Sequence, residues 1–316
     1  MYRHIMVPLD GTAASQHAVP WAFALARKAE SSIDLVRVIP TAFGAEPYGT
    51  TVLNQATVDQ MRIAAREMLR DLAEEMTEKG VPSRAIVIDG EVRDALRSHL
   101  ESDELDLIVM TTHDAGRVER FLIGSVAESL VRNVRCPVLL IRADSDDIPQ
   151  FDDVRTVARI VVPLDGSEFA EEVLPHAITF GRCFQSEMAL MAVIQPVVAI
   201  ATMAADVAGP NVIATLPPAK EADPDPDEVT TYSDVLERAA RRVRDAGLTV
   251  STAVLVDTRP AHAIVDYADR HDADLIAMTT HGRGALKRLV AGSVSRGVLL
   301  GTQKPMLVYR PEKVGR

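Results

Sequence analysis

Two stretches of the chain combine glycines with a histidine, basic side chains and a closing Gly-Ser-Val. THGRGALKRLVAGSV runs from Thr280 to Val294, and THDAGRVERFLIGSV runs from Thr112 to Val126. Glycines let the backbone approach a phosphate, and a helix N-terminus offers unpaired N–H groups with partial positive charge. The pattern therefore predicts contact with an anionic group, with the Ser293 hydroxyl as a further donor or as the helix N-cap. An ordinary capped helix after a glycine turn would have the same sequence.

Signatures of several common enzyme sites are absent from both stretches. Neither contains G-x-x-x-x-G-K-[ST], and AGSVSRG lacks the G-x-S-x-G spacing of a nucleophile elbow. His113 and His281 have no nucleophile or carboxylate partner that the sequence can assign, so we interpret them as residues that orient the loop. We therefore assign no catalytic residue and no metal ligand.

The composition restricts the partners of the protein. The chain has 316 residues and a net charge of −11, from 34 basic and 45 acidic side chains. This balance argues against nonspecific binding to nucleic acid or to anionic membranes, so local backbone geometry must hold any anion. Cys136 and Cys183 lie far apart without a ligand pattern, which favours a reducing cytoplasm over a disulfide framework or a zinc site.

Two segments bear on targeting and membranes. MYRHIMVPLD runs straight into a strand pattern, so we expect no signal peptide. The stretch from Met188 to Ala205 is 18 residues long and uncharged, but Gln195 and Pro196 interrupt its centre. Its first half matches an internal strand of an earlier repeat, and we therefore expect no transmembrane helix.

The sequence contains two copies of the same pattern. An offset of 155 separates His4 in HIMVPLDGT from Arg159 in RIVVPLDGS, and an offset of 168 separates Val87 in VIDG from Leu255 in LVDT. The second copy thus carries about 13 extra residues, which we place in LPPAKEADPDPDE, near Leu216 to Glu228. A period this long indicates a duplicated domain rather than a solenoid.

The repeat defines two domains, which we expect at residues 1–145 and 154–316. The acidic segment between them, ADSDDIPQFDD from Ala143 to Asp153, lacks apolar periodicity and is typical of a linker. The apolar last strands, beginning at Pro137 and Pro305, would leave open edges if each domain stood alone. We therefore expect the domains to pair through these strands as a pseudo-symmetric dimer, and a homodimer of the full chain is a further expectation.

Within each copy, short apolar runs alternate with helical patterns. This alternation predicts an α/β fold, in which each domain has a five-stranded, parallel, doubly wound sheet with helices on both faces. SVAE at Ser125 has capping-box spacing for a further helix. In the first copy the expected strands are His4–Leu9, Ile33–Ile39, Arg84–Ile88, Leu105–Thr111 and Pro137–Ile141, and the expected helices include Ala14–Ala29, Thr57–Glu78 and Val92–Glu101.

Polar turns follow the first and fourth strands of each copy. In doubly wound sheets, ligands bind beyond the carboxyl ends of the strands, where the strand order reverses. The turn at Asp10-Gly11 and the segment from Thr111 to Gly124 are therefore the candidate crevice in the first copy. Asp10 and Asp165 could equally be simple turn residues.

These motifs resemble the universal stress protein family. The resemblance rests on VPLDGS after the first strand and on a fourth-strand loop close to G-x-x-G-x9-G-[ST] followed by Val. It covers nearly the whole chain, twice, and each copy ends in a strand like CPVLLIR. In that family the loop surrounds the phosphates of an adenine nucleotide, the aspartate contacts the ribose or adenine side, and a valine ending the second strand lies against the base.

The resemblance implies one site in each copy for ATP, with or without Mg²⁺. Two departures weaken it: Thr111 and Thr279 replace the first loop glycine, and Asp114 stands where the second copy has Gly282. The second site would comprise Asp165, Gly166, Val193, Thr280, His281, Gly282, Arg283, Gly292, Ser293 and Val294, and the first Asp10, Gly11, Val38, Thr112, Gly124 and Ser125.

The copies should bind unequally. A carboxylate at Asp114 about 5 Å from a phosphate oxygen would cost roughly 3 kcal/mol, or on the order of a hundredfold in affinity, at an effective dielectric of about 20. Lys287 and Arg288 could touch phosphate or lie on an exposed helix face. We also expect the apolar part of the long loop from Gln195 to Thr231 to cover a crevice or an interface.

The leading hypothesis is a cytoplasmic, non-catalytic ATP-binding module of stress response or signalling, with the second site the stronger. A slow ATPase or a self-phosphorylating switch is the enzymatic alternative. A tandem dimerisation scaffold with vestigial crevices is the structural alternative.

Overall fold

The computed structural model describes residues 2–40, 42–43, 51–52, 54–102, 105–112, 124–143, 147, 150, 155–196, 225–280 and 292–311. The first repeat contains β1 (His4–Pro8), α1 (Ala13–Gln16), α2 (Ala18–Ala29), β2 (Ser32–Ile39), β3 (Ala42–Phe43), β4 (Thr51–Val52), α3 (Gln55–Glu78), β5 (Ser83–Asp89), α4 (Val92–Ser102), β6 (Leu107–Thr112), α5 (Ser125–Asn133) and β7 (Val138–Arg142). The second contains β8 (Arg159–Pro163), α6 (Glu168–Glu171), α7 (Leu174–Phe184), β9 (Glu187–Ile194), α10 (Pro226–Asp245), β10 (Val250–Val256), α11 (Pro260–Arg270), β11 (Leu275–Thr279), α12 (Ser293–Gly301) and β12 (Met306–Tyr309).

Each repeat has the doubly wound sheet expected from the sequence. The strand order is β7-β6-β1-β2-β5 in the first repeat and β12-β11-β8-β9-β10 in the second, and the pairings within each of these five-stranded halves are parallel. The short strands β3 and β4 form a separate antiparallel pair. Alternate residues of one strand enter different cores: Ile5 and Val7 face the core shared with α2 and α7, whereas Met6 faces the core shared with α5 and α11. The order in which the chain adds strands to the sheet reverses between β1 and β6 in the first repeat and between β8 and β11 in the second.

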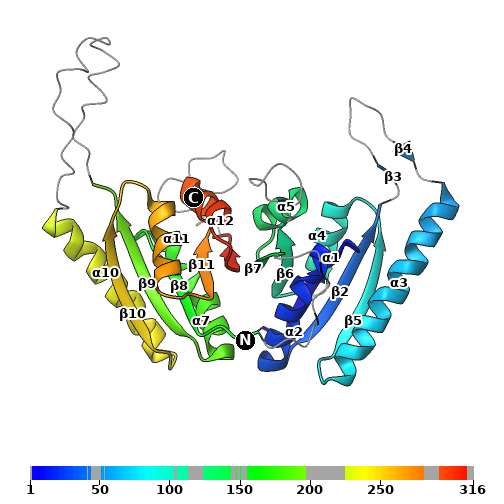
Figure 1. Cartoon of the computed structure of the whole chain (residues 1–316), viewed down its shortest axis with the longest axis horizontal. Coiled ribbons are helices and arrows are strands. Elements are labelled where there is room, and N and C mark those ends of the chain that lie inside the picture. The colour runs from blue at the N-terminus through cyan, green and yellow to red at the C-terminus, as the bar shows by residue number, and fades with distance from the viewer. Residues whose placement is uncertain are drawn as a thin grey trace, which may run out of the picture.

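The two repeats join through their last strands, which confirms that prediction. β7 and β12 pair antiparallel, with Leu139 opposite Leu307, and make one sheet of ten strands. Figure 1 shows these two strands at the centre and β5 and β10 at the outer edges. The pairing removes the two apolar edges that separate domains would have exposed.

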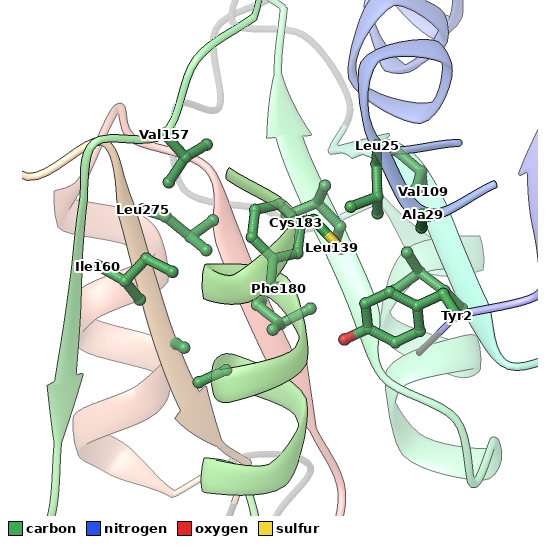
Figure 2. Packing of buried hydrophobic residues seen from close by; sticks show 14 of the residues in the cluster. Tyr2, Leu25, Ala29, Val109, Leu139, Val157, Ile160, Phe180, Cys183 and Leu275 are labelled. Atoms are coloured by element: carbon green, nitrogen blue, oxygen red, sulfur yellow. The ribbon is translucent and has the colours of Figure 1, made fainter. Parts of the chain in front are cut away.

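An apolar core continues across the junction. Phe180 and Cys183 of α7 lie between Ile160 of their own repeat and Leu25 and Tyr2 of the other (Figure 2). The Tyr2 hydroxyl donates a hydrogen bond of 3.2 Å to the carbonyl oxygen of His176. The repeats therefore share side-chain packing as well as backbone pairing.

One expected helix is divided. The pattern from Ala14 to Ala29 predicted a continuous helix, but the chain forms α1 and α2 with a break at His17. Pro20 has no N–H to donate to the carbonyl of Gln16, four residues earlier. Pro175 stands at the matching place in the second repeat, and α6 likewise ends at Glu171, four residues before it.

Strand register corrects the alignment of the repeats. Val38 pairs with Ile88, and its counterpart Val193 pairs with Leu255. Leu255 therefore matches Ile88 and not Val87, which makes the offset 167 at this strand. The offset reaches 168 only from α4 and α11 onward, so one extra residue lies in the turn between β10 and α11.

The insertion ends earlier than expected. Pro226, Asp227 and Glu228 were assigned to the inserted loop but form the first turn of α10. Proline suits the first helical position because its missing N–H is not needed there, and Asp225 caps the helix by accepting from the N–H of Asp227 at 3.0 Å. Residues 197–224, which hold the apolar part of that loop, lie outside the described residues.

The uncharged stretch beginning at Met188 lies in a sheet. Its residues up to Ile194 belong to β9, between β8 and β10. Among the helices that the structure describes, none is long and apolar enough to span a membrane.

Candidate functional site

An Asp-Gly turn follows the first strand of each repeat at the carboxyl edge of the sheet. Gly11 and Gly166 have φ of +80° and +77°, a conformation that other residues adopt only with strain. Asp10 accepts hydrogen bonds from the backbone N–H of Thr12 at 2.9 Å and from its hydroxyl at 2.6 Å. Asp165 accepts the same pair of bonds from Ser167.

These aspartates therefore have a structural role in the turn. Thr12 and Ser167, which they hold, are the N-caps of α1 and α6. The hydrogen bonds show that each aspartate stabilises its own turn. Contact of either carboxylate with a ribose stays a prediction.

The helices that follow the fourth strands begin at the same edge. α5 starts at Ser125 with Gly124 as its N-cap, and α12 starts at Ser293 with Gly292 as its N-cap. Neither cap has a side chain that bonds a backbone N–H. Within the part of the chain that the structure describes, no side chain caps the first-turn N–H groups, which is the arrangement that an anion site at a helix start needs.

The serine N-caps expected from the sequence are wrong. A capping serine must stand in extended backbone just before the helix, and that conformation falls on Gly124 and Gly292, with ψ of 142° and 152°. Ser125 and Ser293 are already helical and exposed. Glu128, the acid of the expected capping box, instead pairs with Arg132 at 3.1 Å.

The start of α12 is bonded to the end of β11 through the carbonyl oxygen of Thr280. That oxygen accepts from the N–H of Gly292 at 2.7 Å, and the Ser295 hydroxyl lies 3.0 Å from it. The same hydroxyl is also 3.0 Å from the carbonyl oxygen of Gly292. Sequence reasoning missed Ser295; the only signal was that the first repeat has Ala127 at this position.

Charge differs at the two helix starts. The first turn of α5 contains Glu128, and the matching residue of α12 is the exposed Arg296. A positive side chain beside an N-terminus adds to the attraction for an anion, whereas a carboxylate opposes it. The two helix starts therefore differ in local charge, although Glu128 is paired with Arg132. The stronger binding of phosphate at the second crevice stays a prediction.

The other predicted residues are only partly placed. Val38 and Val193 lie at the carboxyl ends of β2 and β9, Thr112 ends β6, Thr280 follows β11, and Val294 packs on the core beneath α12. Several predicted residues lie outside the described residues: His113, Asp114, His281, Gly282, Arg283, Lys287 and Arg288. The contrast between Asp114 and Gly282 therefore stays a prediction.

Sequence reasoning also missed two charged residues inside β2. Arg37 reaches over the turn after β1, and Asp34 is fully buried near the opposite end of the strand. The matching residues of β9 are Ala192 and Ala189. Comparing SIDLVRVI with EMALMAVI could have singled out both.

A pocket of about 580 Å³ lies beside the first crevice, at the end of β5 and the start of α4. Its carboxylates include Asp89, Glu91 and Asp94, which would repel a phosphate. Asp89 pairs with Arg62 at 3.0 Å, and Glu91 accepts the backbone N–H groups of Arg93 and Asp94. The pocket therefore has the wrong charge for the anion expected at this edge.

The thiols are poor nucleophiles. Cys136 and Cys183 are free, and burial raises the pKa of Cys136 to about 12. The described residues contain no group of three or more His, Cys, Asp or Glu side chains arranged to hold a metal ion.

Comparisons with known proteins agree on one family. The model of the universal stress protein family matches residues 1–142 and 156–310. A universal stress protein of Mycobacterium tuberculosis strain H37Rv is 30% identical over 209 residues, which cover 66% of this chain and 63% of that relative. One from Methanocaldococcus jannaschii is 28% identical over 144 residues, or 45% of this chain and 83% of its own length.

A solved structure extends the likeness to both repeats at the level of the fold. The universal stress protein from Archaeoglobus fulgidus DSM 4304 superposes with a TM-score of 0.67 at 18% identity, over 99% of this chain and 97% of that one.

Proposed function

The chain belongs to the universal stress protein family, and we propose that it is a non-catalytic adenine-nucleotide-binding module of stress response or signalling. The ligand is ATP, with Mg²⁺ as an accompanying ion, and the second crevice binds it more tightly than the first. The protein acts in the cytoplasm, in keeping with its two free thiols.

The N-terminus of α12 is the observation that carries this proposal. Gly292 leaves the first-turn N–H groups without a side-chain cap, and Arg296 adds positive charge beside them. The bonds to Thr280 hold this end of the helix against β11. A phosphate bound there would meet aligned donors that need no rearrangement.

Two differences between the repeats, one at the helix start and one in the loop, both predict weaker phosphate binding at the first crevice. Glu128 opposes an anion at α5 where Arg296 attracts one at α12. Asp114 would oppose phosphate where Gly282 would not. Both differences favour the second crevice.

Calorimetry with ATP on the full chain, with and without Mg²⁺, tests the proposal. Ser293→Glu places a carboxylate at the first residue of α12 and should weaken the second site at least about tenfold, with Ser125→Glu as the matched change at α5. A carboxylate at this position favours the helix, so the melting temperature should hold or rise, which separates lost binding from misfolding. Unchanged affinity in both variants would contradict phosphate binding at these helices.

A second pair of variants tests the loop. Asp114→Gly should strengthen the first site, and Gly282→Asp should weaken the second by up to about a hundredfold. Mg²⁺ bridging Asp114 to phosphate would reverse the first effect, which is why both conditions are needed. If neither substitution changes a binding constant, the loop does not contact the phosphate.

The ten-stranded sheet favours a second candidate function, a tandem scaffold whose crevices stay empty. Mass spectrometry of small molecules released from the purified protein separates the two. A bound nucleotide supports the module; its absence, with no thermal shift on adding ATP, supports the scaffold.

A further inference from the structure

Arg37 lies across the turn that opens the first crevice. It extends from β2, and its Nη1 lies 3.4 Å from the carbonyl oxygen of Leu9, just beyond β1. A Cβ placed on Gly11 would come within 2.6 Å of the same nitrogen. The guanidinium therefore lies at the carboxyl edge of the sheet, against the backbone of the Asp-Gly turn.

This guanidinium has few partners for a half-buried charge. Burial lowers the pKa of Arg37, and the nearby Asp10 carboxylate opposes that shift. Arginine has five N–H donors, yet the bond to Leu9 is the one the described residues provide, and it is long. A charged donor removed from water is unfavourable unless an anion or acceptor meets it.

The fold does not require Arg37. The second repeat builds the same turn, with Gly166 at φ +77° and Asp165 bonded to Ser167, although Ala192 stands at the matching position. The residue sizes on the strand and on the neighbouring helix are reversed between the repeats. The first repeat has Arg37 on β2 and Ala65 on α3, whereas the second has Ala192 on β9 and Tyr232 on α10. Tyr232 packs against the core that includes Ala192, so that repeat fills the region with apolar groups.

Two anion-attracting features thus lie on opposite sides of β1 in the first crevice. The start of α5 follows β6 on one side, and Arg37 projects from β2 on the other. Two strand spacings separate β6 from β2, which is about 10 Å in the plane of the sheet. Arg37 leaves β2 on the face that holds Leu35, whereas α5 covers the opposite face, so a ligand that meets both must cross the carboxyl edge of the sheet. In doubly wound nucleotide sites, a carboxylate suits free ribose hydroxyls, whereas a nearby arginine accommodates a phosphate on the ribose. In this protein the first repeat has Arg37 near Asp10, whereas the second repeat has Ala192 near Asp165.

We propose that the first crevice prefers a nucleotide that carries a phosphate on a ribose hydroxyl in addition to its 5′-phosphate. The 5′-phosphate binds at the N-terminus of α5, the sugar lies over the Asp10 turn, and Arg37 contacts the second phosphate. Among the described residues of the second repeat, Ala192 stands where the first repeat has Arg37 and supplies no cation, so the second crevice does not distinguish the two kinds of nucleotide. This inference rests on the proposed nucleotide-binding function.

The test compares AMP with adenosine 2′,5′-bisphosphate and adenosine 3′,5′-bisphosphate by calorimetry. The full-length protein carries Gly282→Asp together with Ser293→Glu, so that the first site is measured with the second weakened below it. At least one bisphosphate should bind about tenfold or more tightly than AMP. Arg37→Met keeps a long apolar stem without the charge and should abolish that preference, and Arg37→Lys should retain part of it.

The reciprocal variant acts on the second repeat. In a Ser125→Glu background, Ala192→Arg combined with Tyr232→Ala makes room for a guanidinium and should introduce the bisphosphate preference there. Melting curves show which variants remain folded, and binding is compared only among those.

The outcomes separate the two proposals. If neither AMP nor the bisphosphates nor ATP bind any folded variant, nucleotide binding itself is wrong. If AMP binds but the preference for a bisphosphate is absent, or survives Arg37→Met, this inference alone is overturned. A general gain of affinity in Arg37→Met would also overturn it, because Arg37 would then be an internal counter-ion of Asp10.

Discussion

The two repeats share a backbone plan but differ in how their second strands begin. Asp34 of β2 is fully buried and receives two hydrogen bonds of 2.8 Å from Arg84. His4 and His99 each place Nε2 3.0 Å from the same carboxylate. His4, Asp34 and Arg84 lie near the amino ends of their strands, and His99 reaches the carboxylate from α4, where it also lines the pocket at the end of β5.

The second repeat replaces this cluster with apolar and surface groups. Ala189, Ser251 and Tyr267 match Asp34, Arg84 and His99. Arg159, which matches His4, pairs with Glu187 at 3.0 Å, and both side chains are about one third exposed. One sheet therefore tolerates a buried ionic cluster in one half and packed apolar side chains in the other, which shows that the cluster is not needed for the fold.

The largest expected effect comes from breaking the cluster. Asp34→Ala removes the carboxylate that Arg84, His4 and His99 contact and should destabilise the first repeat by up to about 3 kcal/mol, because the Arg84 side chain is 55% exposed and stays solvated. Adding Arg84→Ser gives both residues that the second repeat uses and should recover much of the loss. Denaturant unfolding of the single and double variants measures the coupling; strictly additive effects would contradict it.

Acid should affect the two repeats in different pH ranges. Burial lowers the pKa of His176 to about 4, so its neutral form stabilises the fold above its unfolded value near 6.5. As the pH falls from about 6.5 to 4, the unfolded chain takes up the proton first and up to roughly 3 kcal/mol of stability is lost.

The stabilisation that Asp34 provides is lost at a lower pH than the stabilisation by His176. Burial raises the pKa of this carboxyl, but hydrogen bonds from Arg84 and His4 outweigh burial and lower it overall. Its stabilisation is present above the unfolded pKa near 3.9 and is lost as the pH falls through the still lower folded value. Hydrogen exchange across the pH range should therefore show α7 losing protection before β2. In His176→Trp, which installs the residue of the first repeat, the early loss should disappear; if it persists, another group causes it.

The smallest expected effect concerns the hydroxyl at the start of α12. Ser295→Ala removes a hydrogen bond to Thr280 or Gly292 and should cost about 1 kcal/mol of stability, with a fewfold loss of nucleotide affinity at the second site. Ala127→Ser is the matched addition in the first repeat and should bring the two sites closer. If Ser295→Ala leaves the ATP affinity of the second site unchanged and Ala127→Ser leaves that of the first site unchanged, this hydrogen bond does not contribute to nucleotide binding.

Much of the fold could be predicted because its signals are local. Buried runs such as HIMVP and VLLIR, the helices between them and the duplicated spacing led directly to two parallel sheets. The open apolar edges at Pro137 and Pro305 also indicated that the last strands would join the two repeats. The errors arose where one residue changes the outcome: Pro20 divides a helix, and the N-cap falls on Gly124 rather than Ser125.

The sequence by itself determined the architecture of this protein, since periodicity and strand ends are properties of neighbouring residues. It also predicted the edge of the sheet where a ligand should bind. Tertiary structure alone brought His4, Asp34, Arg84 and His99 together and laid Arg37 over Gly11. Those contacts join residues 26 to 65 positions apart, and strand register and the side of the sheet decide them. A charged residue within an apolar strand shows only that it needs a partner; which partner it finds depends on the packing of the whole sheet.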